Sequence, residues 1–171
     1  MKLNLGSGST HPAALNVITM DHTGWKSIDI CTLYKADEHY DISEGIREKN
    51  DSIEEIWMGY FFEHLLKLKA LFVIEECFRV LKPGGKLLIS VPDMKIVMPL
   101  WLESNGTDLN QSILICGDQD EIRQKNAIPS VHKFGYTETS LTNIFKEAGF
   151  SKINRTGIHK NCFELALEVY K

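Results

Sequence analysis

The feature that most limits the possible folds of this chain lies between residues 74 and 93. It begins with apolar side chains at the i, i+3, i+4 and i+7 positions of one helix face: Ile74, Cys77, Phe78 and Leu81. The KPGG sequence at 82–85 then ends the helix, because proline cannot continue it and glycine accepts a positive φ. The following run, Lys86–Val91, is almost continuously apolar, which is typical of a parallel strand buried on both faces. A helix that leads directly into such a strand predicts an α/β fold.

Shorter segments with strand patterns precede and follow this unit. Four of them lie before residue 60: residues 2–5, 27–30, 39–42 and 52–58. Two more end the chain, at residues 152–158 and 162–170. In the last segment apolar and polar side chains alternate, which indicates a half-exposed strand and one arm of an antiparallel hairpin.

A second helix is predicted over residues 138–148. Its apolar side chains recur at helical spacing, Thr137 can cap its start, and Gly149 stands where a helix commonly ends. Residues 94–136 are the least regular part of the chain. Proline and turn-forming residues interrupt any long element there: Pro99, Asn105-Gly106 and Pro129.

The 171 residues contain no internal repeat, low-complexity run or linker, so we expect a single domain over 1–171. Strands that alternate with crossover helices predict an α/β sheet with helices on both faces. Ligands of such sheets bind at the carboxyl ends of the strands. Glycine-rich or acidic signatures follow four of the predicted strands: Gly6-Ser7-Gly8, Asp29, Asp41 and Gly59 with its neighbours.

The composition argues against several classes of function. There are 19 basic and 23 acidic residues, a formal charge of −4, and no run of basic residues, so we expect no nucleic-acid partner. The four cysteines have no C-x-x-C spacing, and we expect no metal site. No apolar run is long enough for a signal peptide or a membrane span, so we expect a cytoplasmic protein without membrane contact.

The glycine turn after the first strand and the acid that ends the second strand together indicate a nucleoside ligand. Gly6-Ser7-Gly8 taken alone can be no more than a tight turn. Asp29 follows it at the ~20-residue spacing at which a carboxylate takes ribose hydroxyls. His11 stands where a dinucleotide-binding fold has its third glycine, and no Lys-Ser/Thr pair follows. A cofactor without phosphates therefore fits this loop best.

At these residues the sequence resembles the class I S-adenosylmethionine-dependent methyltransferases, and most closely the small bacterial group similar to methyltransferase type 11. The matching stretches cover most of the chain in the family's order: 3–9 (LNLGSGS), 24–30 (GWKSIDI), 54–65 (EEIWMGYFFEHL), 76–93 (ECFRVLKPGGKLLISVPD) and 132–150 (HKFGYTETSLTNIFKEAGF). The resemblance implies an α/β, Rossmann-like, mostly parallel seven-stranded sheet with helices on both faces and a C-terminal antiparallel hairpin. We expect the family's N-terminal helices to be absent, and residues 94–131 or a second subunit to cover the site.

The resemblance implies S-adenosylmethionine as cofactor, bound by a defined set of residues: Leu5, Gly6, Ser7, Gly8, Asp29, Ile30, Asp41, Ile42, Met58, Gly59 and Tyr60. The backbone of the glycine turn would lie against the methionine and the ribose. Asp29 would hold the ribose hydroxyls with Ile30 beside the adenine. Asp41 would accept from the adenine amino group, with Ile42 packed on the ring. Residues 58–60 would form the floor near the sulfonium, where carbonyl oxygens and an aromatic ring stabilise positive charge.

Three residues are candidates for catalysis: His132, His64 and Tyr136. Methyl transfer to oxygen usually needs a base, and in the resembling family the 132–136 stretch faces the methyl group. We therefore expect His132 to act as base or acceptor clamp, with Tyr136 orienting it or binding the acceptor. His64, with Glu63, matches the family's Glu-His pair beside the methionine end. Two alternatives stay open: His64 as a structural histidine at a helix start, and His132 as a surface-loop histidine.

The function that these features favour is methyl transfer from S-adenosylmethionine to an oxygen or nitrogen of a small-molecule or glycan acceptor. Residues 94–136 are expected to form the acceptor side or a lid, and a homodimer is compatible with the sequence. Two other functions remain open. One is a non-catalytic module that binds S-adenosylmethionine, and the other is a short nucleotide-dependent oxidoreductase, against which the missing third glycine argues.

Overall fold

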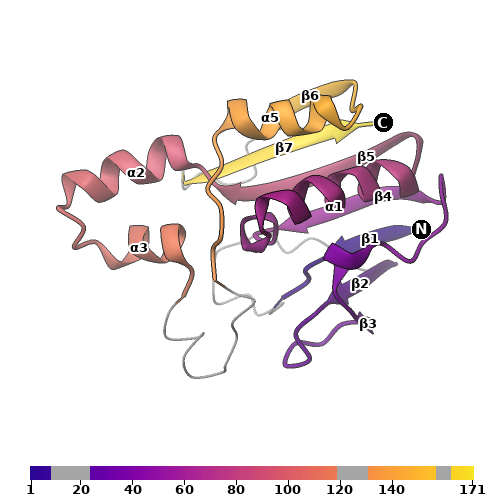
Figure 1. The fold of residues 1–171 in the computed structure, drawn as a ribbon, viewed down its shortest axis with the longest axis horizontal. Helices are drawn as coiled ribbons and strands as arrows, with labels where there is room; N and C mark the ends of the chain where they lie inside the picture. The colour runs from indigo at the N-terminus through magenta and orange to yellow at the C-terminus, as the bar shows by residue number, and fades with distance from the viewer. Residues whose placement is uncertain (9–23, 119–130, 157–162) are drawn as a thin grey trace.

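A seven-stranded sheet forms the centre of the molecule (Figure 1). The computed structural model describes residues 1–8, 24–118, 131–156 and 163–171. The strands have the following bounds: β1 Lys2–Leu5, β2 Trp25–Asp29, β3 Glu38–His39, β4 Ile53–Gly59, β5 Leu81–Pro92, β6 Lys152–Thr156 and β7 Glu164–Tyr170. Their order is β3-β2-β1-β4-β5-β7-β6. The pairs from β3 to β5 are parallel, and β7 runs antiparallel to both β5 and β6.

The connections on the two sides of β1 place a topological switch in the sheet. β1 pairs with β2 on one side and with β4 on the other, so the chain leaves the first half of the sheet and returns to start the second half. Ligands of open α/β sheets bind at the carboxyl ends of the strands on either side of such a point. The carboxyl ends of β1, β2 and β4 are therefore where a ligand site is expected.

The described helices fall into two groups. The sheet is covered by α1 Lys67–Val80 and α5 Glu138–Glu147, and α2 Met94–Glu103 and α3 Leu109–Cys116 extend beyond the end of β5 (Figure 1). Two 3-10 turns, η1 Ile42–Glu44 and η2 Phe62–His64, follow β3 and β4. None of the helices among the described residues is both long enough and apolar enough to cross a membrane.

One face of the sheet and the two covering helices build a single core. Alternate residues of the strands pair in register on this face, as Leu3 does with Ile56 and Ile56 does with Leu87. All three side chains are fully buried, together with Ile74 of α1 and Phe145 of α5. At about 25 cal/mol per Å² of apolar surface, each large side chain buried here stabilises the fold by roughly 1.5–3 kcal/mol.

The opposite face of the same strands carries charged side chains toward the strands' amino ends. Glu55 on β4 forms ion pairs with Lys2 on β1 at 2.7 Å and with Lys86 on β5 at 3.0 Å. Lys86 also lies 3.5 Å from Glu168 on β7. These four charged side chains make this end of the sheet face polar. Each of them is partly exposed and ion-paired, so none is a buried charge without a partner.

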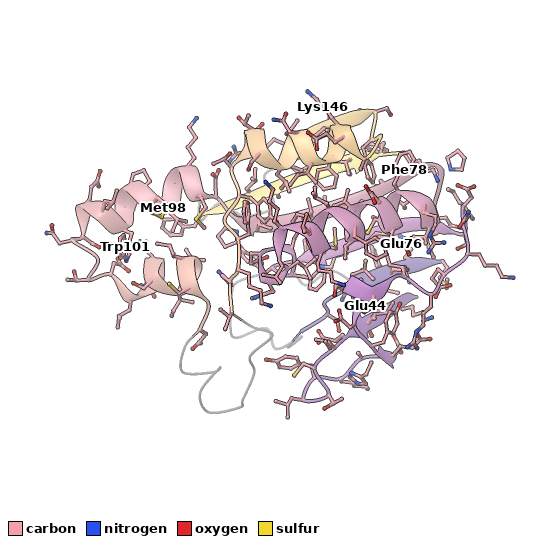
Figure 2. All side chains as sticks on the ribbon, in the orientation of Figure 1. Glu44, Glu76, Phe78, Met98, Trp101 and Lys146 are labelled. Atoms are coloured by element: carbon pink, nitrogen blue, oxygen red, sulfur yellow. The ribbon has the colours of Figure 1, made fainter. Side chains whose placement is uncertain are left out.

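Smaller contacts fix the peripheral elements. Glu76 of α1, labelled in Figure 2, accepts from the Ile46 backbone N–H at 2.9 Å and so holds the loop after η1. Trp101 of α2, also labelled there, donates through Nε1 to Ser112 Oγ of α3 at 3.1 Å. The helix cap predicted at Thr137 is present, in the form of a capping box with Ser140 as its second member, and Gly149 has the positive φ of +100° expected at a helix end.

Three sequence predictions about local structure are wrong. The helix before KPGG ends at Val80, so Leu81 and residues 82–85 belong to β5 and not to the helix and its end. Residues 39–42 do not form a strand, since only Glu38–His39 pairs with β2. The Asp41 carboxylate instead accepts from the Ser43 backbone N–H at 2.8 Å and starts η1. Pro99 does not interrupt an element but lies inside α2, a helix whose first turn is fixed by the Asp93 cap. Four predictions lie outside the described residues: those for His11, Pro129, residues 157–158 and Cys162.

Candidate functional site

Gly6 begins the turn at the carboxyl end of β1, where no other residue type fits. Its φ is +65°, and its backbone N–H donates to the Ile28 carbonyl of β2 at 2.9 Å. A Cβ added at this position would lie 2.2 Å from Cδ2 of Phe61, well inside van der Waals contact. Gly6 is therefore required for both conformation and space. Phe61, which imposes the second requirement, carries no local signal in the sequence.

Asp29 joins the glycine turn to the end of β2. The Gly8 backbone N–H donates to Asp29 Oδ2 at 2.7 Å, and the Cys31 backbone N–H donates to Asp29 Oδ1 at 2.7 Å. The Asp29 side chain is only 6% exposed. With these two donors from the described residues, each carboxylate oxygen keeps a second lone pair, so the group can accept two more hydrogen bonds in a fixed orientation. This orientation is what a carboxylate needs to bind two neighbouring hydroxyl groups.

The structure places the other expected cofactor residues in different environments. Leu5 at the end of β1, Met58 near the end of β4 and Ile42 in η1 all have side chains in the hydrophobic core, which leaves their backbone groups for a ligand. Ile30 is 46% exposed just after β2. Ser7, between the two glycines, has a buried Oγ with no hydrogen-bond partner among the described residues. The individual contacts of these residues with a cofactor stay predictions.

The end of β4 has a constrained backbone. A Cβ added to Gly59 would lie 2.6 Å from the Trp57 ring. Tyr60 has a φ of +49°, which is uncommon for a residue other than glycine, and its N–H donates to the Ser90 carbonyl at 2.9 Å. Burial, followed by the charges of Glu164 and Glu63, raises the pKa of the Tyr60 hydroxyl. Unusual backbone geometry of this kind is typical of ligand-binding sites.

Directly after this strand end, Glu63 and His64 of η2 meet His132. Their potential ligand atoms all lie within 4.8 Å of one another. The two imidazole rings are 4.7 Å apart, centroid to centroid, at an interplanar angle of 66°. Their Nδ1 atoms contact backbone carbonyls, at 3.2 Å from Val131 for His64 and at 3.0 Å from Leu114 for His132. The fold thus collects three chemically active side chains from two distant segments.

Backbone hydrogen bonds hold these two segments together. The N–H groups of Lys133 and Phe134 both donate to the Glu63 carbonyl, at 2.8 and 3.2 Å. The Lys133 ammonium donates to the His64 carbonyl at 2.7 Å. Because the two bonds to the Glu63 carbonyl join main-chain atoms only, they hold the two segments together whichever side chains occupy these positions.

Burial dominates the electrostatics of the cluster. It raises the pKa of the Glu63 carboxyl from 4.5 to about 8, since this side chain is 1% exposed and neither oxygen has a hydrogen-bond partner in the described part of the chain. Burial, and then the neighbouring His132, lowers the pKa of His64 to about 4, whereas the Val131 and Tyr60 carbonyls act in the opposite direction. Burial also lowers the pKa of His132. At neutral pH, all three groups are therefore uncharged in the isolated protein.

Tyr136 borders the same cluster and is 1% exposed. Its ring packs against Phe62 and Phe134, with centroid distances of 5.0 and 5.1 Å. Burial and the charge of Glu63 raise the pKa of the Tyr136 hydroxyl, and that hydroxyl has no partner among the described residues. His64 and His132 are thus in contact, and Tyr136 lies near Glu63 of the same cluster. His132 is partly exposed, in a segment without regular secondary structure.

Comparison with known proteins shows what kind of fold carries this site. No protein-family model and no curated protein matches the sequence. An S-adenosylmethionine-dependent methyltransferase from Archaeoglobus fulgidus superposes with a TM-score of 0.64 at 14% identity, covering 99% of this chain and 85% of that one. For one from Mesorhizobium loti the TM-score is 0.60 at 11% identity, with 99% and 90% covered. The chain has the fold of S-adenosylmethionine-dependent methyltransferases.

A third structure with this methyltransferase fold was solved with ligands. The 1,6-didemethyltoxoflavin-N1-methyltransferase of Burkholderia thailandensis, with bound 1,6-didemethyltoxoflavin and S-adenosylhomocysteine, superposes with a TM-score of 0.58 at 12% identity and 99% and 70% coverage. The resemblance predicted from the sequence is confirmed at the level of the fold. The mostly parallel seven-stranded sheet with an antiparallel C-terminal pair is confirmed as well.

Sequence reasoning missed two features of the site in this methyltransferase fold. It noted Glu63 as half of a Glu-His pair but gave no sign that its carboxylate is buried with no partner among the residues that the structure describes. It also gave no weight to Phe61, whose ring touches Gly6 and whose neighbours form η2. Phe61 therefore links the glycine turn to the Glu63 cluster. The sequence FFEH at 61–64 could be recognised as part of a motif, but it could not show that Phe61 lies against Gly6.

Proposed function

We propose that the protein is a methyltransferase that binds S-adenosylmethionine at the carboxyl ends of β1, β2 and β4 and methylates an oxygen or nitrogen of a small-molecule or glycan acceptor. One observation carries the proposal. The Asp29 carboxylate is buried at the topological switch, oriented by Gly8 and Cys31, and keeps lone pairs for two hydroxyl donors. The methyltransferase fold of the chain supports the same cofactor.

Within this proposal, the cluster of Glu63, His64, His132 and Tyr136 forms the acceptor side. It lies beyond the end of β4, next to Tyr60, and α2 and α3 stand at the same end of the sheet (Figure 1). A neutral imidazole accepts a proton from an acceptor hydroxyl or amine, and burial keeps the His132 ring neutral. Positioning the acceptor about 3 Å from the methyl carbon supplies much of the remaining acceleration.

Asp29→Asn tests the cofactor assignment. The amide keeps the size of the side chain but replaces one acceptor oxygen by an NH₂ donor. That oxygen can then no longer accept from the Gly8 N–H or from a ribose hydroxyl. We expect affinity for S-adenosylhomocysteine, measured by calorimetry, to fall by at least tenfold. Asp51→Asn is the matched control, because Asp51 is exposed and ion-pairs with Lys171 away from the strand carboxyl ends. Equal affinities of all three proteins would contradict the assignment.

Turnover is measured with an acceptor screen by mass spectrometry. A methylated product that forms only with S-adenosylmethionine supports a catalytic function. Cofactor binding without product in that screen would favour the non-catalytic binding module instead.

A further inference from the structure

We propose that Glu63, His64 and His132 form a binding site for a divalent transition-metal ion, held by two imidazole nitrogens and one carboxylate oxygen. Metal binding requires neither the cofactor nor an acceptor, so the proposal does not rest on the proposed function.

The distances between the three side chains suit a single ion. Their candidate ligand atoms lie within 4.8 Å of one another. A zinc-like ion takes nitrogen at about 2.0–2.1 Å and carboxylate oxygen at about 2.0–2.2 Å, so its ligands lie roughly 3–4 Å apart. Small side-chain rotations bring the three atoms to that spacing. The backbone hydrogen bonds from Lys133 and Phe134 to Glu63 already fix the two segments relative to each other.

Both imidazoles have one ring nitrogen on a backbone carbonyl, as metal-binding histidines do. Nδ1 of His64 lies 3.2 Å from the Val131 carbonyl, and Nδ1 of His132 lies 3.0 Å from the Leu114 carbonyl. A neutral ring that donates from Nδ1 to a carbonyl keeps its lone pair on Nε2. Metal-binding histidines almost always donate their other ring N–H in this way, which fixes the tautomer and strengthens the ligand.

Glu63 provides an independent observation. Its side chain is 1% exposed, and among the described residues neither carboxylate oxygen has a hydrogen-bond partner. A buried polar group without a partner costs about 1–3 kcal/mol, and it requires an explanation in a native structure. A bound cation supplies the missing partner. The nearby Lys133 ammonium does not, because it contacts the His64 carbonyl at 2.7 Å from an exposed position.

The ligand set selects the class of ion. Imidazole nitrogens favour zinc, iron, cobalt or nickel, whereas magnesium and calcium prefer sites made of oxygen ligands alone. Three protein ligands leave at least one coordination position open, which is typical of catalytic rather than structural sites. An acceptor hydroxyl bound there would lose its proton more easily. In the metal-bound protein His132 is thus a ligand, and its action as a base belongs to the metal-free state.

Calorimetry tests the site with Zn²⁺ and Co²⁺ titrated separately into protein stripped of metal by a chelator, without cofactor. We expect one equivalent to bind, and Glu63→Gln, His64→Asn and His132→Asn each to weaken binding by at least tenfold. His39→Asn is the matched control, since His39 is exposed on β3 and should leave the affinity unchanged. A wild type that binds neither ion at 1 mM, or three variants that bind as the wild type does, would overturn the proposal.

Thermal unfolding of the same proteins provides a readout that does not depend on heats of binding. A saturating ion should raise the melting temperature of the wild type and of His39→Asn but not that of Glu63→Gln. Glu63→Gln is expected to fold, because the amide is neutral and equal in size. Asp29→Asn separates the two proposals: it should keep metal affinity while losing cofactor affinity. Loss of both in Asp29→Asn would contradict the independence of the metal site.

Discussion

Glu63→Gln is expected to change how the stability of the metal-free protein depends on pH. Burial raises the pKa of the Glu63 carboxyl to about 8 in the folded state, whereas the unfolded chain has the ordinary value of 4.5. Between these two values the folded state keeps a proton that the unfolded state releases. The free energy of unfolding therefore falls as pH rises, starting near 4.5 and ending near 8.

The size of the effect follows from the two pKa values. Keeping the carboxyl protonated while the unfolded chain ionises costs the fold about 3 kcal/mol by pH 7, and about 5 kcal/mol above pH 8. Glutamine at position 63 cannot ionise, so this loss is absent in the variant. The buried histidines act in the opposite direction, because burial lowers the pKa of His64 to about 4 and the fold loses stability below pH 6.5. They are present in both proteins, so their effect cancels in the comparison.

The assay is urea unfolding of both proteins at pH 5 and at pH 8.5, with a chelator present throughout. We expect Glu63→Gln to gain about 3–5 kcal/mol relative to the wild type between the two pH values. A constant difference between the two proteins would show that the Glu63 carboxylate is ionised and partnered in the fold. With Zn²⁺ in place of the chelator, the wild type should regain the stability that the variant cannot.

Two further substitutions test the site at other positions. Gly6→Ala should abolish cofactor binding and lower stability, because its Cβ would lie 2.2 Å from the Phe61 ring. Gly8→Ala, whose Cβ would lie 3.9 Å from the nearest described atom, should unfold at a higher temperature than Gly6→Ala in thermal melts. Equal melting temperatures for the two variants would contradict the steric argument. Tyr136→Phe removes a buried hydroxyl that has no partner among the described residues, so the free energy of unfolding should stay the same or rise by about 1 kcal/mol. A loss of turnover in Tyr136→Phe at unchanged cofactor affinity would then assign the hydroxyl to the acceptor.

Much of the fold was predictable because its signals are local. The apolar run of β5, the glycine turn after β1 and the cap at Thr137 each depend on a few neighbouring residues. These residues bias the backbone before any tertiary contact forms. Where two local signals competed, prediction failed. Residues 39–42 are apolar enough for a strand, but the Asp41 carboxylate satisfies the Ser43 N–H and forms a turn instead.

The sequence by itself determined most of the strands, the helices at residues 67–80 and 138–147, the glycine turn and the acid that faces it, because spacing along the chain sets periodicity and turn chemistry. The helices α2 and α3 were not predicted. Only the tertiary structure decided which distant groups meet. Phe61 excludes a side chain at Gly6, and His132 joins Glu63 and His64 through the backbone bonds of residues 133 and 134. Whether a carboxylate is solvated or buried without a partner is a property of everything packed around it, and no motif around Glu63 records it.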